Sequence, residues 1–385
     1  MRVAHFCDSQ TGRPDGVARS VELSVRLLRE AGHEADLYRP GPLLGRGVRS
    51  VPVPFRQVRV GLPFTARPAD VVHVHSTGPI GMTGFRAAAD WGVPLVLTWH
   101  TDLLAYADLF VEVPVGAAWC ALSLGLGWSP REFLELSRPG AVRLRRLIEL
   151  GKGMFARAAV AIAPSAKTAA GFAVFEPAAE TCVLPTPVTG TAGEPARNGR
   201  NVVLSVGRAT PEKNPELLLQ AFTRVRAARP DARLVLLGAR QQRRWLDRRI
   251  AALGLTGHVQ VRPPVPHDQV GDFYRTADVL AFASTTDTQS LVLAEAEATG
   301  LPVVVADAGL AARPGAAGAG RFVCEPAPDA FADALLRMLA DDDLRARVTR
   351  EGRAAIEAYT PEVFLRRLVE IYDRAGKSPG RTRPL

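Results

Sequence analysis

Short runs of β-branched and other apolar residues alternate with helix-like segments along almost the whole chain. This alternation is typical of βαβ units, which build parallel sheets. The clearest strands expected in the first half are Val3–Phe6, Ala35–Tyr38, Val71–His75, Pro94–Thr98 and Val160–Ala163. The pattern restarts in the second half, with strands expected at Val202–Val206, Leu234–Leu237, Val259–Val261, Val279–Ala283 and Val303–Val305. The sequence therefore predicts an α/β protein with two doubly wound parallel sheets.

The segment between the two halves has the composition of a linker. Leu184–Arg200 is rich in Pro, Thr and Gly and has little hydrophobic periodicity. We therefore expect a first domain over 1–185, a linker over 186–200 and a second domain over 201–360. A strong helix pattern at Pro361–Ala375 follows the second sheet, so the chain is expected to end in a separate helix and tail over 361–385.

Composition excludes several classes of protein. The hydrophobic fraction of 47% and the charged fraction of 23% exclude a disordered chain of 385 residues. The four cysteines are widely spaced with no Cys-x-x-Cys pair, which disfavours a zinc ribbon or a disulfide framework. The chain opens on a strand pattern rather than a signal peptide, and the uncharged stretch Val113–Trp128 is too short to span a bilayer. We expect a cytoplasmic protein in which Val113–Trp128 is a buried or interfacial helix.

The charge balance points to an anionic partner. Lys and Arg number 48 against 39 Asp and Glu, which leaves a formal charge of +9. That excess is compatible with nucleic acid, a membrane surface or phosphate groups. A nucleic-acid partner is disfavoured because aromatic residues, which would stack on bases among the cations, are only 6% of the chain.

In doubly wound folds ligands bind beyond the carboxyl ends of the strands. The loop after the first strand, Asp8–Val17, contains Gly12 and Gly16 and leads directly into a helix, where backbone amides favour an anion. It matches neither a Walker A loop nor a G-x-G-x-x-G fingerprint. Taken alone, this loop is equally compatible with a phosphate site and with a tight strand–helix turn.

The loop after the strand Val202–Val206 is more informative. Gly207 closes the strand, and Arg208 and Lys213 follow five residues apart before the next helix. A forked guanidinium and an ammonium so placed form a clamp for two adjacent phosphates. The alternative is a pair of solvated surface cations.

The stretch Ser284–Val303 carries the strongest signal. A strand ends, hydroxyl residues and Asp287 form a turn, and a helix begins whose first amides, near Thr288 to Leu291, favour an anion. Glu295 is eight residues after Asp287, at most about 12 Å along a helix axis. The two acids could hold hydroxyl-bearing groups on either side of a phosphate bridge. The alternative is an N-cap at Asp287 and a helix-face carboxylate at Glu295.

These motifs together resemble retaining glycosyltransferases of family 4, which have the GT-B fold. The stretch from Asp287 to Glu295 is similar to the family's acid–seven residues–Glu motif, and Gly207-Arg208…Glu212-Lys213 to its donor-phosphate loop. Further matches, in chain order, are Gly16-Val17, Leu28–Glu34, Asp70–His75, Thr98–Asp102, Val265–His267 and Ala277–Val279. The resemblance covers roughly residues 3 to 306.

The resemblance implies two Rossmann-like domains facing each other across a cleft, with a C-terminal helix crossing back to the N-terminal domain. It implies transfer of a sugar from a nucleoside-diphosphate sugar, with retained anomeric configuration, no metal and no cofactor. The reacting groups it implies are His100, Arg208, Lys213 and Asp287. The donor site it implies comprises Gly16, Gly207, Arg208, Lys213, Thr288, Gln289, Ser290, Leu291 and Glu295. The acceptor side it implies comprises Asp8, Asp15, His75, Trp99 and Asp102.

Within that site, the resemblance assigns the donor pyrophosphate to Arg208 and Lys213, the ribose to Glu295 and the hydroxyls of the transferred sugar to Asp287. The sequence departs from the family pattern in three places. Asp287 stands where Glu is commoner, Ser290 where a glycine is often found, and Leu184–Val188 where an Asn-Gly turn is more usual. These departures leave the identity of the sugar open.

We expect a hexose or pentose carried on a nucleoside diphosphate, UDP first, and an acceptor that is a small natural product such as an aminocyclitol, a glycolipid or a polysaccharide. A role in antibiotic biosynthesis fits the Ala- and Arg-rich composition. The alternatives are a nucleotide-sugar epimerase or a phosphorylase of the same fold, or a non-catalytic basic sugar-binding or membrane-surface protein.

Two further features have alternative interpretations. His73 is expected in the core or in interdomain packing, whereas His75, at the strand end, is as compatible with a ligand contact. The segment 137–157 carries six Arg and Lys residues among apolar ones. It could contact anionic lipid at the inner membrane face, but the favoured interpretation is a solvated helix face.

Overall fold

The computed structural model describes residues 1–10, 16–43, 47–52, 59–188, 201–240, 242–311 and 320–377. The chain divides into two compact units, one made of Met1–Thr186 with Glu362–Leu385 and the other of Pro187–Pro361. The linker expected over 186–200 lies at this division, and its residues 189–200 are outside the described residues.

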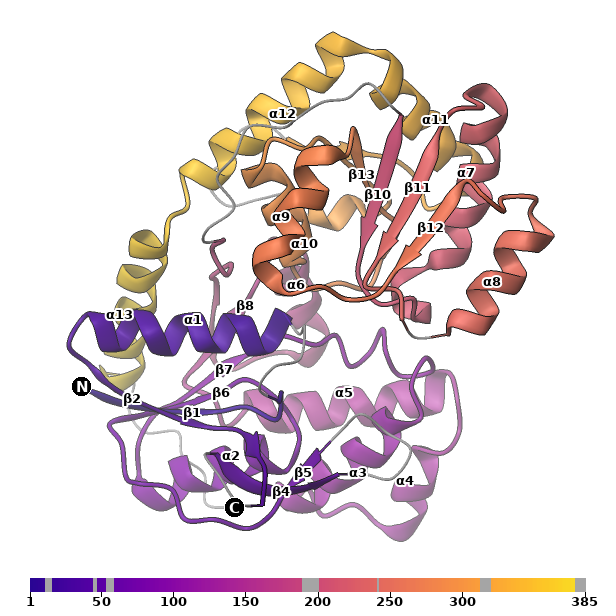
Figure 1. The fold of residues 1–385 in the computed structure, drawn as a ribbon. Coiled ribbons are helices and arrows are strands. Elements are labelled where there is room, and N and C mark those ends of the chain that lie inside the picture. The colour runs from indigo at the N-terminus through magenta and orange to yellow at the C-terminus, as the bar shows by residue number, and fades with distance from the viewer. Residues whose placement is uncertain are drawn as a thin grey trace. The chain divides into compact units, whose positions relative to one another are not determined.

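The first unit is built on a six-stranded parallel sheet with the order β2-β1-β6-β7-β8-β9 (Figure 1). Its strands are β1 (Arg2–Phe6), β2 (Glu34–Tyr38), β6 (Val71–Val74), β7 (Leu95–Thr98), β8 (Val160–Ala163) and β9 (Glu180–Val183). Its helices are α1 (Gly16–Glu30), α2 (Pro79–Trp91), α3 (Glu112–Ser123), α4 (Pro130–Glu135), α5 (Ala141–Phe155) and α6 (Ala166–Gly171). A small separate sheet contains β3 (Pro40–Gly41), β4 (Val48–Pro52) and β5 (Arg59–Gly61).

Amphipathic helices cover both faces of this sheet. Helix α1 lies over one face and α2 over the other in Figure 1. In α1, Val21, Val25 and Leu28 are buried at the spacing of one helix face. The last helix, α13 (Pro361–Lys377), follows the second unit in the chain but belongs to the first unit. Its Tyr372 is buried, with the hydroxyl 2.7 Å from Nδ1 of His73.

The second unit has the same architecture. Its parallel sheet has the order β12-β11-β10-β13-β14-β15. The strands are β10 (Val202–Val206), β11 (Arg233–Leu237), β12 (Val259–Arg262), β13 (Val279–Phe282), β14 (Val303–Val305) and β15 (Phe322–Val323). The helices are α7 (Pro215–Ala228), α8 (Arg243–Ala252), α9 (His267–Thr276), α10 (Leu291–Ala298), α11 (Pro328–Ala340) and α12 (Asp342–Glu357).

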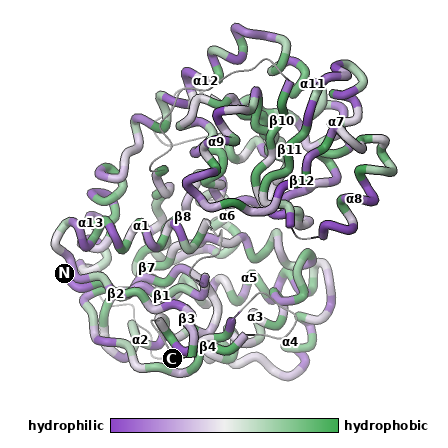
Figure 2. The backbone as a smooth tube through the Cα atoms, in the orientation of Figure 1, coloured by the Kyte–Doolittle hydropathy of each residue, from purple (hydrophilic) through white to green (hydrophobic). Residues whose placement is uncertain are grey.

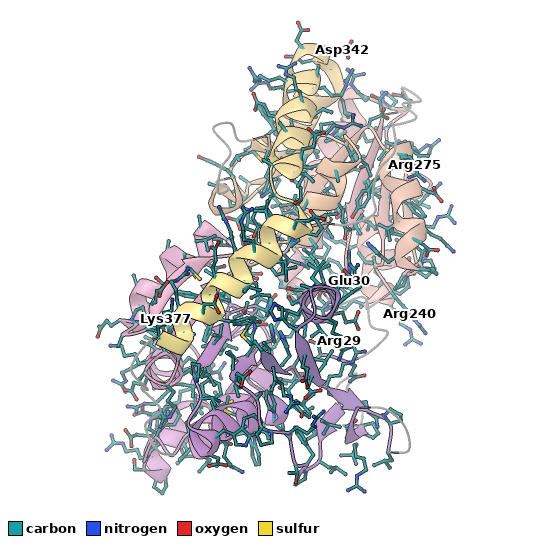
Figure 3. All side chains as sticks on the ribbon, turned by 90° about the vertical axis from the view of Figure 1, so that its left-hand side faces the viewer. Arg29, Glu30, Arg240, Arg275, Asp342 and Lys377 are labelled. Carbon is teal, nitrogen blue, oxygen red and sulfur yellow. The ribbon has the colours of Figure 1, made fainter. Side chains whose placement is uncertain are left out.

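Side chains of successive residues in these strands enter different parts of the core, because strand side chains alternate between faces. Val203 and Val279 pack in a cluster with α7, α8 and α11, whereas Leu204 and Leu280 pack in a cluster with α9 and α10. The strands in the middle of both sheets are correspondingly hydrophobic in Figure 2. Charged side chains such as Arg240, Arg275 and Asp342 point outward from the second unit (Figure 3).

Each sheet has a point where the strand order reverses. In the first sheet β1 lies between β2 and β6, and in the second β10 lies between β11 and β13. Ligands of doubly wound folds bind at this switch point, outside the carboxyl ends of the strands. The loops that follow β1, β6, β10 and β13 are therefore the positions where site residues belong.

Most strands expected from the sequence are present, with ends that differ by one residue or so. The β3–β5 sheet, β9 and β15 were not expected. Strands β3 to β5 contain Pro, Gly and Arg, which give little apolar alternation, and β9 and β15 are only four and two residues long. The stretch Val113–Trp128 forms α3 over Glu112–Ser123, with Ala117, Cys120 and Ala121 buried and the opposite face exposed. Among the described residues, no helix is long and apolar enough to cross a membrane.

Candidate functional site

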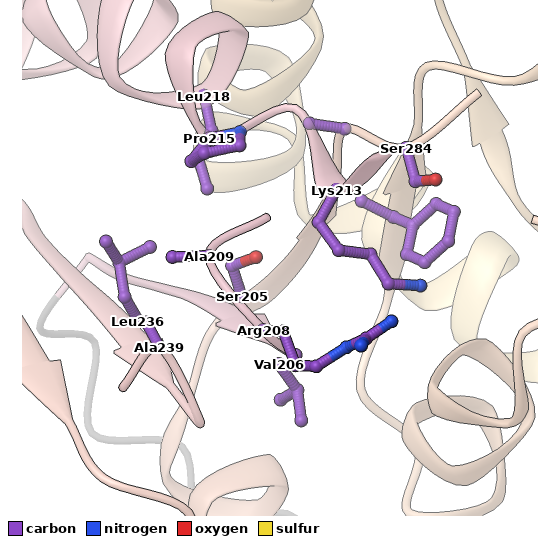
Figure 4. Close-up of a pocket in the computed structure, with 13 residues that line it drawn as sticks. Ser205, Val206, Arg208, Ala209, Lys213, Pro215, Leu218, Leu236, Ala239 and Ser284 are labelled. Carbon is purple, nitrogen blue, oxygen red and sulfur yellow. The ribbon is translucent and has the colours of Figure 1, made fainter. Parts of the chain in front are cut away.

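The loop after β10 folds back so that its two cations point into the same space. Gly207 has a φ of 146°, which an L side chain rarely adopts, and the aliphatic carbons of Lys213 lie over its Cα. Asn214, with φ of 48°, then begins α7 and its side chain accepts from the amide of Leu217. Figure 4 shows Arg208 and Lys213 converging on the pocket that Gly207 and Ser284 also line.

Lys213 makes a two-pronged ion pair with the acid expected from the sequence. Its Nζ is 2.6 Å from Oδ1 and 2.8 Å from Oδ2 of Asp287. The side chain of Asp287 is 8% exposed and that of Lys213 is 28% exposed. The two residues are 74 positions apart in the chain and meet because β10 and β13 are neighbours in the sheet. The structure therefore brings together two of the four predicted reacting groups.

Arg208 is held by a residue that sequence reasoning missed. Its Nη2 is 2.9 Å from Oε1 of Glu212, whose side chain is fully buried. The backbone oxygen of Glu212 in turn accepts from Ser284 Oγ at 2.7 Å, which ties this loop to the loop after β13. The four-residue spacing between Arg208 and Glu212 was the available signal, but similar spacings are common on protein surfaces.

The loop before α10 has an unusual backbone. Ser290 has φ of 62° and ψ of 100°, and its side chain does not cap the helix. A residue with a Cβ is strained in this region, which explains why a glycine is the commoner choice there. Thr288, Gln289, Ser290 and Leu291 are each partly exposed, so this helix start is open to a ligand.

The two glutamates of α10 have different partners. Glu295 is 2% exposed, and its Oε2 accepts from the hydroxyl of Tyr274 at 2.8 Å. Glu297 is equally buried but forms a forked ion pair with Arg321, at 2.7 and 3.1 Å. Glu295 thus has a neutral hydroxyl donor beside it, whereas Glu297 is part of an internal ion pair. The ribose contact of Glu295 stays a prediction.

In the first unit, Asp8 caps a helix. Its carboxylate accepts from the amides of Ile80 and Gly81, at 2.9 and 3.0 Å, and from Ser76 Oγ at 2.6 Å. Burial raises the pKa of Asp8, while these hydrogen bonds act in the opposite direction. The role that the structure shows for Asp8 is to begin α2, and its predicted acceptor contact stays a prediction.

A group of four histidines lies at the carboxyl edge of the first sheet. His5 Nδ1 is 2.9 Å from His75 Nε2, and His75 Nδ1 is 3.2 Å from His100 Nε2. His73 is bound between Tyr372 and Thr98 Oγ1, each 2.7 Å away. Burial lowers the pKa of His5 to about 3 and those of His73 and His75 well below the ordinary value. At neutral pH these three rings are therefore uncharged.

Two residues predicted on the acceptor side are buried. His75 is 4% exposed, and its Nδ1 lies 3.2 Å from His100 Nε2. Trp99 is also buried, and its ring packs against Phe155 and Phe175 in the core. The acceptor contacts predicted for these two residues stay predictions.

The other residues predicted in the first unit's part of the site lie in loops or at a helix start, or outside the described residues. Asp102 accepts from the amides of Leu104 and Ala105 and so shapes its own turn. His100 is partly exposed, and Gly16 is the exposed first residue of α1. Asp15 lies outside the described residues.

Two arginines of the basic segment 137–157 form ion pairs within the first unit. Arg143 pairs with Asp108 at 2.7 Å, and Arg146 bridges Glu132, Glu135 and Glu149. Both arginines are buried on α5. Arg143 and Arg146 are therefore not available to a membrane surface, because their guanidinium groups are buried and paired. Lipid contact through the other cations of the segment stays a prediction.

Solved structures with the same fold define the class of protein. Sucrose-phosphate synthase from Thermosynechococcus elongatus matches with a TM-score of 0.70 at 17% identity, covering 98% of this chain and 100% of that one. The Anabaena HepE protein in complex with UDP-glucose matches with a TM-score of 0.63 at 16% identity, covering 97% and 99%. Together with the two parallel sheets, these likenesses show a GT-B fold.

The family follows from sequence comparison. The chain matches the model of a glycosyl transferase 4-like domain over residues 15–187 and that of glycosyl transferases group 1 over 191–355. It is 32% identical to a D-inositol 3-phosphate glycosyltransferase of Xylanimonas cellulosilytica, covering 80% of this chain and 72% of that protein. It is 27% identical to a GDP-mannose-dependent alpha-mannosyltransferase of Mycolicibacterium smegmatis, covering 80% of each. The chain belongs to the group 1 glycosyltransferases.

Proposed function

We propose that the protein transfers a hexose or pentose from a nucleoside-diphosphate sugar to an acceptor hydroxyl, with retention of anomeric configuration and without a metal. The observation that carries this proposal is the Lys213–Asp287 pair, with Arg208 beside it, at the switch point of the second sheet. UDP is the first candidate for the nucleotide, because a relative in fold was solved with UDP-glucose. GDP is the competitor, because a sequence relative is named for GDP-mannose.

The ion pair suits both halves of a sugar nucleotide. An incoming diphosphate competes with Asp287 for the Lys213 ammonium, and Arg208 adds a second donor from the same loop. Asp287, released from Lys213, can then accept hydrogen bonds from sugar hydroxyls. The amides at the start of α10 add positive potential for the phosphates. Lys213, Arg208 and these amides stabilise the negative charge that develops on the departing diphosphate.

The chemical step in this proposal occurs on one face of the sugar. The bond between the anomeric carbon and the diphosphate oxygen breaks, and a bond to the acceptor oxygen forms on the same side. The acceptor proton passes to the departing phosphate, so no protein group has to remove it. Because cations and amides of the chain supply the stabilising charge, transfer should continue in excess EDTA.

For the acceptor, we propose a small cyclitol or a related polyol. Support comes from the names of several relatives as D-inositol 3-phosphate glycosyltransferases. At the carboxyl edge of the first sheet the partly exposed ring of His100 lies against the uncharged ring of His75, and imidazole nitrogens can exchange hydrogen bonds with hydroxyl groups. Incubation with UDP- and GDP-sugars and a panel of inositols and aminocyclitols, read by mass spectrometry, would identify the product.

Donor binding is the first experiment. Thermal shift with UDP, GDP, ADP and dTDP should raise the melting temperature of the wild-type protein with at least one of them. Lys213→Ala should abolish that rise. The matched control is Arg224→Ala, which removes an exposed cation of the same unit that pairs with Asp329. A response to no nucleotide in the wild type, or an equal response in Lys213→Ala, would overturn the proposal.

A lipid-linked acceptor is the second candidate, favoured by an apolar stripe on α3. Val111, Val115, Trp119 and Leu122 recur at helical spacing and are 52–72% exposed. On α4 and just beyond it, exposed Leu134 stands between Arg131 and Arg138 at three- and four-residue spacing, which adds positive charge beside apolar surface. We propose that an anionic bilayer covers this stripe.

Vesicle sedimentation tests the second candidate. The protein should bind vesicles containing phosphatidylglycerol, and Trp119→Ser with Leu122→Ser should reduce binding at least several-fold. Trp245→Ser, on the second unit, is the matched control. Absence of binding to anionic vesicles would leave the small polyol as the acceptor class.

A further inference from the structure

Three of the histidines in the first unit form a line of rings joined edge to edge. The rings of His5 and His75 are tilted by only 13°, and those of His75 and His100 by 25°. Their centroids are 5.2 and 5.4 Å apart, much farther than the 2.9 and 3.2 Å that separate the facing nitrogens. Rings in this arrangement lie nearly in one plane and share N–H···N hydrogen bonds, rather than stacking by their faces.

Such a line has a direction. A neutral imidazole carries one N–H and one bare nitrogen, so each ring in the line donates on one side and accepts on the other. His100 therefore carries its proton on Nδ1 if the line runs from His5 outward, and on Nε2 if it runs inward. The two directions also differ at the buried end, which is His5.

The buried end favours the outward direction. His5 is fully buried, and its Nε2 has no hydrogen-bond partner among the described residues. An inward line would place an N–H on this nitrogen, whereas an outward line leaves it bare. Buried N–H groups without a partner are rarer than under-satisfied acceptors. We therefore expect His5 Nδ1–H to donate to His75 Nε2, and His75 Nδ1–H to donate to His100 Nε2.

We propose that His5 and His75 are positioning residues that hold His100 as its Nδ1–H tautomer, so that His100 offers a hydrogen-bond donor to a substrate oxygen. The meaning of this tautomer for catalysis rests on the function proposed above. A bare His100 Nδ1 would act as a base toward an acceptor hydroxyl. A protonated Nδ1 instead orients or polarises a hydroxyl or phosphate oxygen and leaves the acceptor proton to the departing diphosphate.

Two other roles for the group fit the geometry less well. The line cannot carry a proton inward, because it ends at a buried ring whose pKa is lowered to about 3. A metal ion on His5, His73 and His75, whose ligand atoms lie within 4.8 Å of one another, would compete with existing bonds. The His5–His75 and His75–His100 bonds and both bonds of His73, to Tyr372 and Thr98, already use five of the six nitrogens.

The test is nitrogen NMR of the full-length protein labelled with 15N-histidine. Long-range 1H–15N spectra at pH 8 distinguish protonated from bare ring nitrogens, and the His100→Gln variant identifies the His100 signals. The wild-type protein should show His100 with its proton on Nδ1. His75→Leu should shift His100 toward the Nε2–H form. His75→Asn, whose amide can donate from the Nδ1 position, should restore the wild-type pattern, and exposed His267→Leu should leave it unchanged.

A wild-type spectrum with the proton on His100 Nε2 would overturn the proposal. This test does not require any variant to fold. An unchanged His100 signal in a folded His75→Leu protein would also overturn it. A change at His5 and His73 on adding one equivalent of Zn²⁺ would assign the group to a metal instead. These NMR measurements need no substrate, and the donor-binding experiment does not depend on His100. A failure of the tautomer proposal can therefore be distinguished from a failure of the proposed function.

Where turnover is measured, His75→Leu should lower kcat about tenfold or more with little change in the KM for the donor. His75→Asn should recover most of that loss. An equal loss in both variants would indicate a structural role for His75 alone.

Discussion

The two units share one architecture but stabilise the polar groups at their strand ends in different ways. Both have six parallel strands and a switch point beside the first strand. The first unit places neutral histidines and the capping Asp8 at this edge. The second places ion pairs there, with Lys213 on Asp287 and Arg208 on Glu212. The same scaffold therefore holds its strand-end polar groups mainly by hydrogen bonds between neutral rings in one unit and by cation–carboxylate pairs in the other.

The largest effect expected of a substitution is a loss of stability in the second unit, at an ion pair that we expect to be structural and to have no part in nucleotide binding. Arg321 and Glu297 form a buried ion pair, with side chains 6% and 2% exposed. Because Arg321→Met leaves Glu297 buried without its partner, the free energy of unfolding should fall by about 3–5 kcal/mol. Urea denaturation measures this loss. Adding Glu297→Met should restore most of the stability, and nucleotide binding in that double variant should match the wild type.

Acidification should destabilise the first unit more than the second. Folding lowers the pKa of His5, His73 and His75, whereas the unfolded chain binds protons at these rings below about pH 6.5. Their contribution to stability is therefore complete above that pH and is lost as pH falls, with a limiting slope of about 1.4 kcal/mol per pH unit for each ring. Asp8, whose pKa burial raises, opposes this trend as a single group.

We expect the first unit to lose about 4–5 kcal/mol of stability between pH 7 and pH 5, after the opposing contribution of Asp8. Hydrogen exchange measured by mass spectrometry, after correction for the pH dependence of intrinsic exchange, reports each unit separately. Protection should fall first in β1, β6 and β7. Earlier loss in β10 and β13 would contradict the assignment of pH sensitivity to the histidines.

A third variant separates stability from binding at the donor site. Because Lys213→Ala leaves Asp287 without its cation, the free energy of unfolding should fall by about 1–2 kcal/mol, less than for a fully buried pair since Lys213 is partly exposed. Removing Asp287 as well, as Asp287→Ala, should recover that stability but not nucleotide binding. Recovery of both would show that Lys213 acts only through Asp287.

The smallest effect concerns the backbone before α10. Ser290 holds a positive φ that costs a residue with a Cβ about 1 kcal/mol relative to glycine. Ser290→Gly should therefore raise the unfolding free energy by about 0.5–1 kcal/mol, partly offset by the greater freedom of glycine in the unfolded chain. A destabilised Ser290→Gly protein would mean that the Ser290 hydroxyl makes a stabilising contact that outweighs the strain.

Much of the fold and part of the site could be predicted from the sequence. Apolar runs such as Val202–Val206 and Val279–Phe282 identify buried parallel strands by composition alone. The family motifs identified Lys213 and Asp287, which the structure joins. Glu212, Tyr274 and His5 were missed, because their importance depends on partners that are distant in the chain or hidden by burial. The burial of Trp99 and His75 was not evident from the sequence for the same reason.

The sequence by itself determined the two α/β sheets, the division near residue 186 and the cationic loop, because hydrophobic periodicity and turn chemistry are local properties of the chain. Only the tertiary structure decided which polar side chain each charged group pairs with and which of these pairs are buried. It pairs Arg143 and Arg146 with internal acids, gives Glu297 to Arg321 and Glu295 to Tyr274, and aligns three histidines from three strand ends. The physical reason is that desolvation and hydrogen bonding depend on neighbours in space, which residue spacing along the chain does not specify.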